Sequence, residues 1–231
     1  MPSLLQRYFA QQDVINVIQQ QASASPVALL AVSKTRPADD VATLYKAGHR
    51  DFGENYLQDA LEKQRALAHL DIAWHFIGPI QSNKTRDIAR YFSWVHSVDR
   101  LKVTRRLSEQ RPSHLPPLNI CLQVNVDEEE TKAGLMLDEL RDKIEPILAL
   151  ENIRLRGLMA IPKAGKTVAE QRQSFKKVAD ALVEINQQFD LALDTLSMGM
   201  SGDLEAAISE GATMVRVGTA IFGVRATKSK V

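Results

Sequence analysis

The sequence predicts an α/β protein that folds as a single (β/α)8 TIM barrel over residues 1–231. The length of 231 residues falls in the range of about 200–250 residues that is usual for one such barrel. Eight short apolar runs alternate with longer segments of helical composition, and no linker, repeat or low-complexity tract divides the chain. An open doubly wound sheet is the alternative, because a strand count cannot show that a sheet closes.

The first half of the chain begins this alternation. Apolar residues recur at roughly helical spacing between residues 4 and 18, which predicts an opening amphipathic helix. Strands are then predicted in VALLAVS, HRDFGEN, AWHFIG and SWVHSVD, at residues 27–33, 49–55, 73–78 and 93–99. The helices that follow them are predicted at residues 39–48, 58–70, 83–92 and 99–110. Each is long enough for the crossover that parallel strands require.

The second half continues the pattern to the end of the chain. Strands are predicted in LNICLQVNV, IRLRGLMAI, DTLSMGM and MVRVGT, at residues 118–126, 153–161, 194–200 and 214–219. The helices between them are predicted at residues 137–150, 170–189 and 202–211. We expect no second, β-rich domain, because no stretch of that size is left over.

Composition lowers the expectation for several classes of partner. Hydrophobic residues make up 45% and charged residues 25% of the chain, so a sizeable core can form. The 29 Lys and Arg nearly balance the 28 Asp and Glu, which argues against nucleic acid or an anionic membrane as partner. No signal sequence or membrane span is evident, and the single cysteine, Cys121, excludes an intrachain disulfide. We therefore expect a cytoplasmic protein.

The carboxyl ends of the predicted strands carry the polar residues of interest. Ligands in barrels of this kind bind at that end. Lys34 falls at the end of the first strand, and Asn55 ends the second. Lys34 is either a solvated lysine or an amine that forms a Schiff base when its pKa is lowered.

The loops after the seventh and eighth strands predict an anion site. Ser201 is predicted to cap a helix that Gly211 ends, and Gly218 with Thr219 supplies the neighbouring loop. Phosphate commonly binds at these two loops in barrels. Glycine turns and a cap without any ligand are the alternative.

Arg216 interrupts an otherwise apolar strand. Alternation places it on one face with Met214 and Gly218. A buried guanidinium keeps its charge and needs an acceptor or an anion. Arg216 is therefore either part of a structural ion pair or a ligand contact. Together with Lys34 and the phosphate-sized loops, it suits a phosphorylated carbonyl compound.

The histidines and the cysteine predict packing rather than metal binding. His75 and His96 lie in predicted strands near tryptophans, where we expect them to pack inside the protein. The histidines show no short metal-binding spacing, and Cys121 lacks a partner cysteine, so no metal is predicted. Cys121 is expected to be a small buried side chain.

Seven motifs, taken in order, resemble those of the YggS/PROSC family of pyridoxal phosphate homeostasis proteins, which bind pyridoxal 5′-phosphate (PLP). The motifs are AVSKT, DFGENY, WHFIGPIQSNK, VNVDEEETKAGL, RGLMAIP, LSMGMSGD and VRVGTAIFG. They run through nearly the whole chain, whereas VRATKSKV at its end is less family-like. The resemblance implies a PLP-binding barrel of fold type III, like the N-terminal domain of alanine racemase.

The resemblance also implies a set of cofactor-binding residues. Lys34 in AVSKT would form the Schiff base with PLP, and Arg216 in VRVGT would face the pyridine nitrogen. The phosphate-binding segments would be those of Ser201, Gly218 and Thr219. The remaining positions that would line the pocket are Asn55 in GENY and Met198 in SMGM.

The resemblance implies a carrier that holds and delivers PLP in vitamin B6 homeostasis, with effects on amino-acid balance and no catalytic residues. PLP-dependent apoenzymes are the expected recipients, and we expect a monomer. The alternative is a PLP-dependent amino-acid racemase. A PLP-free Schiff-base aldolase acting on a sugar phosphate would suit Lys34 and the loops but not the ordered motifs.

Overall fold

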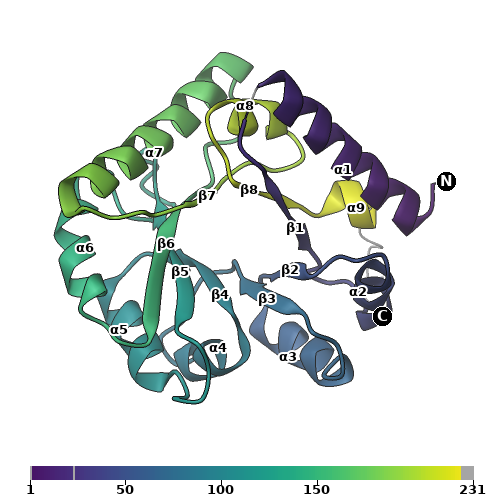
Figure 1. Cartoon of the computed structure of the whole chain (residues 1–231), viewed down its shortest axis with the longest axis horizontal. Helices are drawn as coiled ribbons and strands as arrows, with labels where there is room; N and C mark the ends of the chain where they lie inside the picture. Colours follow the sequence, from purple (N-terminus) through teal and green to yellow (C-terminus); the bar gives the residue numbers. More distant parts are fainter. Residues whose placement is uncertain (1, 23, 225–231) are drawn as a thin grey trace.

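Eight parallel strands close into a barrel in the order of the sequence (Figure 1). The structure is a computed structural model that describes residues 2–22 and 24–224. The strands are β1 (Ala28–Val32), β2 (Asp51–Glu54), β3 (Ala73–Phe76), β4 (Trp94–Val98), β5 (Leu118–Val124), β6 (Ile153–Ala160), β7 (Thr195–Ser197) and β8 (Met214–Val217). Pairing of β1 with β8, with Leu30 opposite Arg216, closes the sheet. This confirms the predicted barrel and excludes the open sheet.

Helices surround the barrel, as the crossover connections require (Figure 1). They are α1 (Leu4–Gln21), α2 (Ala38–Lys46), α3 (Leu57–Ala66), α4 (Thr85–Tyr91), α5 (Leu101–Gln110), α6 (Arg141–Leu148), α7 (Val168–Phe189), α8 (Leu204–Ser209) and α9 (Thr219–Phe222). All eight predicted helices are present. The short α9 was not predicted, because its four residues are too few to show helical periodicity.

Residues 1, 23 and 225–231, which include most of VRATKSKV, lie outside the described part of the chain. The prediction of one domain over residues 1–231 therefore extends beyond that part and stays a prediction. Within it, α1 packs beside α9 (Figure 1), and the Arg7 guanidinium donates a hydrogen bond of 2.7 Å to the Ile221 carbonyl. This contact ties the first helix to the end of the barrel.

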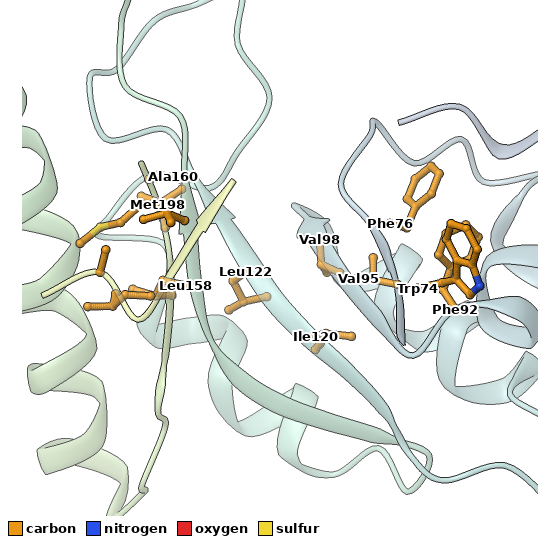
Figure 2. Packing of buried hydrophobic residues seen from close by; sticks show 14 of the residues in the cluster. Trp74, Phe76, Phe92, Val95, Val98, Ile120, Leu122, Leu158, Ala160 and Met198 are labelled. Carbon is orange, nitrogen blue, oxygen red and sulfur yellow. The ribbon is translucent and has the colours of Figure 1, made fainter. Parts of the chain in front are cut away.

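The apolar core lies between the barrel and its helices. Alternation along each strand sends one set of side chains outward to the helices and the other into the barrel. The outward set includes Trp74 and Phe76 of β3, and the Phe76 ring meets the ring of Phe92, the residue that ends α4, edge-on with centroids 5.3 Å apart (Figure 2). Burial of these large side chains is the main favourable contribution to folding.

Gly157 permits a close approach of β6 to β7 that no other residue would allow. A Cβ atom on Gly157 would lie 1.9 Å from the Thr195 carbonyl oxygen. We therefore expect Gly157→Ala to lower the free energy of unfolding by about 1–3 kcal/mol or more, because the strands would have to separate. Urea denaturation measures this change.

Gly202→Ala is the matched control, since a Cβ there would meet nothing within 4 Å. Its free energy of unfolding should change by no more than about 0.5 kcal/mol. Equal changes in the two variants would show that the β6–β7 contact does not depend on the glycine.

Candidate functional site

The carboxyl ends of three adjacent strands bring the principal predicted residues together. Lys34 is two residues beyond β1 and is partly buried. Asn55 directly follows β2, and Gly218 directly follows β8, and both of these strands pair with β1. A Cβ on Gly218 would lie 3.3 Å from the Val32 carbonyl oxygen, which shows how closely the ends of β1 and β8 approach.

Asn55 carries a buried polar atom that needs a donor. Its Oδ1 atom has no hydrogen-bond partner among the described residues. Its backbone packs closely against the segment that follows β3, because a Cβ on Gly78 would lie 2.1 Å from the Asn55 carbonyl oxygen. A buried acceptor without a donor carries a desolvation penalty, which a donor on a ligand could remove.

A buried ionic cluster supports the chain just before Lys34. The Glu54 carboxylate accepts hydrogen bonds from the Ser33 hydroxyl at 2.6 Å and from Lys63 Nζ at 2.5 Å. Lys63 also donates to the Ser33 carbonyl at 2.7 Å. Burial raises the pKa of Glu54 although Lys63 acts against the rise. Sequence reasoning missed this cluster, because Lys63 in α3 looks like any other helix-surface lysine.

Arg216 lies inside the barrel and is 4% exposed. It donates to the Ser197 carbonyl, to Ser197 Oγ at 3.0 Å and to the Ala160 carbonyl at 2.9 Å. Within the described chain these acceptors are all neutral, so the structural ion pair considered for Arg216 is not formed. Contacts with described residues use three of the five guanidinium N–H donors in this way, and two have no acceptor among those residues.

The serine that Arg216 contacts belongs to a longer chain of polar side chains inside the barrel. His96 Nδ1 lies 2.7 Å from Ser197 Oγ, and His96 Nε2 lies 2.9 Å from His75 Nδ1. His75 Nε2 lies 3.1 Å from Asp51 Oδ1. The prediction that His75 and His96 pack inside the protein is confirmed, since both are fully buried.

Burial controls the charges of the side chains in this polar chain. It lowers the pKa of His96 well below the usual 6.5, and the charges of His75 and Arg216 lower it further. Burial also lowers the pKa of His75, although Asp51 opposes this effect. Burial is the largest single influence on Asp51 and acts to raise its pKa, but the hydrogen bond from His75 and the charges of His75 and His49 together outweigh it, so the pKa lies below its ordinary value. Burial lowers the pKa of Arg216 to about 10. At neutral pH both imidazoles are therefore neutral, while Asp51 and Arg216 are charged.

The predicted helix cap at Ser201 is wrong. Helix α8 begins at Leu204 with Asp203 in the cap position, and Ser201 is exposed in the preceding turn. The Asp203 carboxylate accepts a hydrogen bond from the Met200 backbone N–H, which fixes the turn. Gly211, with φ of +92°, follows α8 as predicted. Ser201 thus lies in the predicted loop but does not stabilise the helix.

Thr219 occupies a position that the sequence did not reveal. It is the first residue of α9, Gly218 is the cap residue, and the Thr219 side chain is exposed. The first N–H groups of a helix have no partner within it. In many barrels a short extra helix after the eighth strand presents such groups to phosphate.

Met198 does not meet the other predicted site residues through its side chain. It is fully buried and belongs to the apolar cluster with Leu158 and Ala160 (Figure 2). Ser197, its neighbour, points into the barrel toward His96 and Arg216. Successive side chains of a strand face opposite ways, and continuing this alternation past Ser197 directs the Met198 side chain to the helices. That Met198 lines the pocket stays a prediction, to which its backbone and not its side chain would contribute.

Cys121 lies outside the site and is the small buried side chain that the sequence predicts. Cys121 is fully buried, and burial raises its pKa to about 12. Over residues 2–22 and 24–224, no cluster of three or more His, Cys, Asp or Glu side chains is arranged to hold a metal ion. In the same ranges no helix has the length and apolar character of a bilayer span.

Comparison with known proteins identifies relatives over most of the chain. Residues 10–226 match the family model "Alanine racemase, N-terminal domain". A "Pyridoxal phosphate homeostasis protein" of Pseudomonas aeruginosa is 61% identical over 199 residues, which cover 86% of this chain and 85% of the relative. The structure of PipY from Synechococcus elongatus with PLP bound superposes with a TM-score of 0.80 at 38% identity, covering 91% of this chain and all of PipY. Alanine racemase from Corynebacterium glutamicum shares the fold, with a TM-score of 0.69 at 16% identity over 94% of this chain and 61% of the racemase.

Proposed function

The chain belongs to the family of pyridoxal phosphate homeostasis proteins, which have the barrel of the alanine racemase N-terminal domain, and we propose that it holds PLP on Lys34 for delivery to other proteins. The observation that carries this proposal is the placement of Lys34 beside the β8 end, above a buried Arg216 with two unused donors. PipY, which is similar in fold and sequence, has been solved with PLP bound.

The residues present fit the cofactor. When bound, PLP supplies an aldehyde that condenses with a primary amine and a ring that withdraws electrons. The Lys34 nitrogen would form the C=N bond while the aldehyde oxygen leaves as water. Arg216 would donate to the ring nitrogen with one of its unused N–H groups. The unpaired Asn55 Oδ1 supplies an acceptor next to Lys34.

Two loops would bind the phosphate. Backbone N–H groups at the start of α9, after Gly218, have no partners within the helix. Thr219 and Ser201 expose hydroxyl groups on the loops after β8 and β7. Hydrogen bonds from such donors to a charged oxygen contribute about 1.5–3 kcal/mol each. The Met198 side chain is left out of this set, because it lies in the apolar core.

The chemistry of Arg216 supports a carrier rather than an enzyme. A guanidinium donates hydrogen bonds but does not readily release a proton. Arg216 would therefore hold the ring nitrogen unprotonated, and an unprotonated ring withdraws electrons more weakly than a protonated one. We propose that the protein has no catalytic residues, and that it delivers PLP as a cytoplasmic monomer to PLP-dependent apoenzymes. An amino-acid racemase is the second candidate, because alanine racemase shares this fold.

Amino-acid turnover in deuterium oxide separates the two candidates. The PLP-loaded protein should introduce deuterium at the Cα atom of L-amino acids no faster than free PLP does. A protein without a positioned proton donor and acceptor forgoes the 100- to 10,000-fold contribution typical of general acid–base catalysis. Transfer of the bound cofactor to an apoenzyme, followed by recovery of that enzyme's activity, should proceed in the same preparation.

The opposite result in either measurement would contradict the carrier. Sustained deuterium exchange at Cα at about one turnover per second, which is the low end of enzymatic rates, would favour the racemase if Lys34→Ala abolished the exchange. Failure of the apoenzyme to recover activity would contradict delivery, although it would leave PLP binding intact.

A further inference from the structure

The inside of the barrel carries a continuous polar chain where barrels usually pack branched apolar side chains. It runs from Asp51 at the amino end of β2 through His75, His96 and Ser197 to Arg216, with successive distances of 3.1, 2.9, 2.7 and 3.0 Å. The His75 ring also stacks on Trp94 with an interplanar angle of 8°, which fixes its orientation. Apolar replacement of buried ionic groups is often neutral or stabilising, so stability alone does not account for this chain.

Asp51 and Arg216, the two ends of the polar chain, determine the direction of its hydrogen bonds. Asp51 is an ionised acceptor, so the proton of neutral His75 must lie on Nε2, and His75 Nδ1 is an acceptor. His96 therefore donates from Nε2, and its Nδ1 accepts the hydroxyl proton of Ser197. The Ser197 oxygen is then oriented to accept from Arg216, which can only donate. All four contacts pair one donor with one acceptor.

We propose that Asp51, His75, His96 and Ser197 are positioning residues that orient the Arg216 guanidinium toward the ring nitrogen of PLP. The Ser197 and Ala160 carbonyls, which the backbone holds in place, accept hydrogen bonds from two other N–H groups of Arg216. The third acceptor, the Ser197 hydroxyl, is the one whose direction depends on its hydrogen-bond partner. The hydroxyl of Ser197 would rotate freely without His96. With its proton committed to His96, it presents its lone pair to one defined N–H of Arg216.

The polar chain of side chains ends, at Asp51, at the face of the barrel opposite to Lys34. The Asp51 side chain is 40% exposed and lines a cavity of about 430 Å³ at the amino end, together with Tyr8 and His49. Other charged or titratable groups that act on the chain are His49 at the Asp51 end, and Asp203 and Cys121 near Arg216. Substitution at Asp51 therefore changes the polar chain at the point farthest from the proposed cofactor site.

A pair of ligands that differ only at the ring nitrogen tests the inference, which rests on the proposed function. We would measure the affinity for PLP and for 1-deaza-PLP, in which carbon replaces that nitrogen. The wild-type protein should prefer PLP by about 10- to 150-fold, the range for a hydrogen bond from a charged donor, and Arg216→Met should lose this preference. Ser197→Ala should reduce the preference by about 2- to 12-fold, the range for a neutral hydrogen bond, and Asp51→Asn should reduce it in the same direction.

A purely structural role would weaken both ligands equally and leave their ratio unchanged. Ser174→Ala is the control, since Ser174 is also a buried, hydrogen-bonded serine but lies on α7 outside the chain. It should keep the wild-type preference. An unchanged ratio in Ser197→Ala or in Asp51→Asn would overturn the inference while PLP binding stands. A wild-type protein that binds no PLP would instead overturn the proposed function, and the inference with it.

Discussion

Lys34→Ala is expected to lose its covalent link to PLP completely while it still binds the cofactor weakly. Replacement of the amine removes the nitrogen that condenses with the aldehyde, whereas Arg216, Thr219 and the loop N–H groups are unchanged. Borohydride reduction of the loaded protein, followed by peptide mapping, measures the link. The wild-type label should lie on the peptide that contains Lys34, and the variant should carry no label.

Lys176→Ala provides the control for this experiment. Lys176 is an exposed lysine on α7 that pairs with Asp180 at 2.9 Å, far along the chain from Lys34. Its replacement should leave the label in place. Reduction that modifies another lysine in the wild-type protein would refute the assignment of Lys34, whatever the affinity of the Ala variant.

The strands and most helices could be predicted because their signals are local. An apolar run such as VALLAVS indicates a strand by itself, and helical composition over ten or more residues indicates a crossover helix. The position of Lys34 at a strand end follows from the same run. Closure of the sheet is not local, because it depends on pairing between β1 and β8, which are separated by most of the chain.

The polar chain inside the barrel was missed for the same reason. Its members come from β2, β3, β4, β7 and β8, and each predicted strand contributes only one of them, so no local motif marks the group. A signal is nevertheless present in the alternation of side chains along each strand, which singles out Arg216. His75, His96 and Ser197 lie, like Arg216, on the face of their strands that points into the barrel. Alignment of the predicted strands by that alternation would have placed them together.

The cap predicted at Ser201 and the pocket position predicted for Met198 came from different kinds of signal. A serine just before a helical segment suggests a cap, but here a further turn precedes α8 and Asp203 takes the cap position. Met198 was assigned to the pocket by resemblance of its motif. Its side chain is buried in the apolar core, as alternation after Ser197 also indicates, and its place at the pocket stays a prediction.

Lys63→Met is expected to lower the free energy of unfolding by about 3–5 kcal/mol, because it leaves the Glu54 carboxylate buried with one hydroxyl partner. Both members of the pair are nearly inaccessible, at 7% and 0% side-chain exposure. The deficit should depend on pH. Loss of the ammonium would raise the pKa of Glu54 in the folded state further above its ordinary 4.5. A raised folded-state pKa favours folding below the ordinary value and disfavours it as pH rises, so the deficit should shrink in acid and grow toward neutrality.

Two further variants decide whether the lost charge partner is the cause. Glu54→Leu combined with Lys63→Met removes both charges and should recover most of the stability, since an apolar pair of similar size is tolerated where an ion pair was buried. Lys176→Met breaks an exposed pair and should leave stability unchanged, because solvent screens such pairs. Urea denaturation across pH measures all three proteins. If the double variant were as unstable as Lys63→Met, the lysine would stabilise the β1 end through its hydrogen bond to the Ser33 carbonyl rather than through Glu54. In that case the support beneath Lys34 would depend on one donor and not on the ion pair.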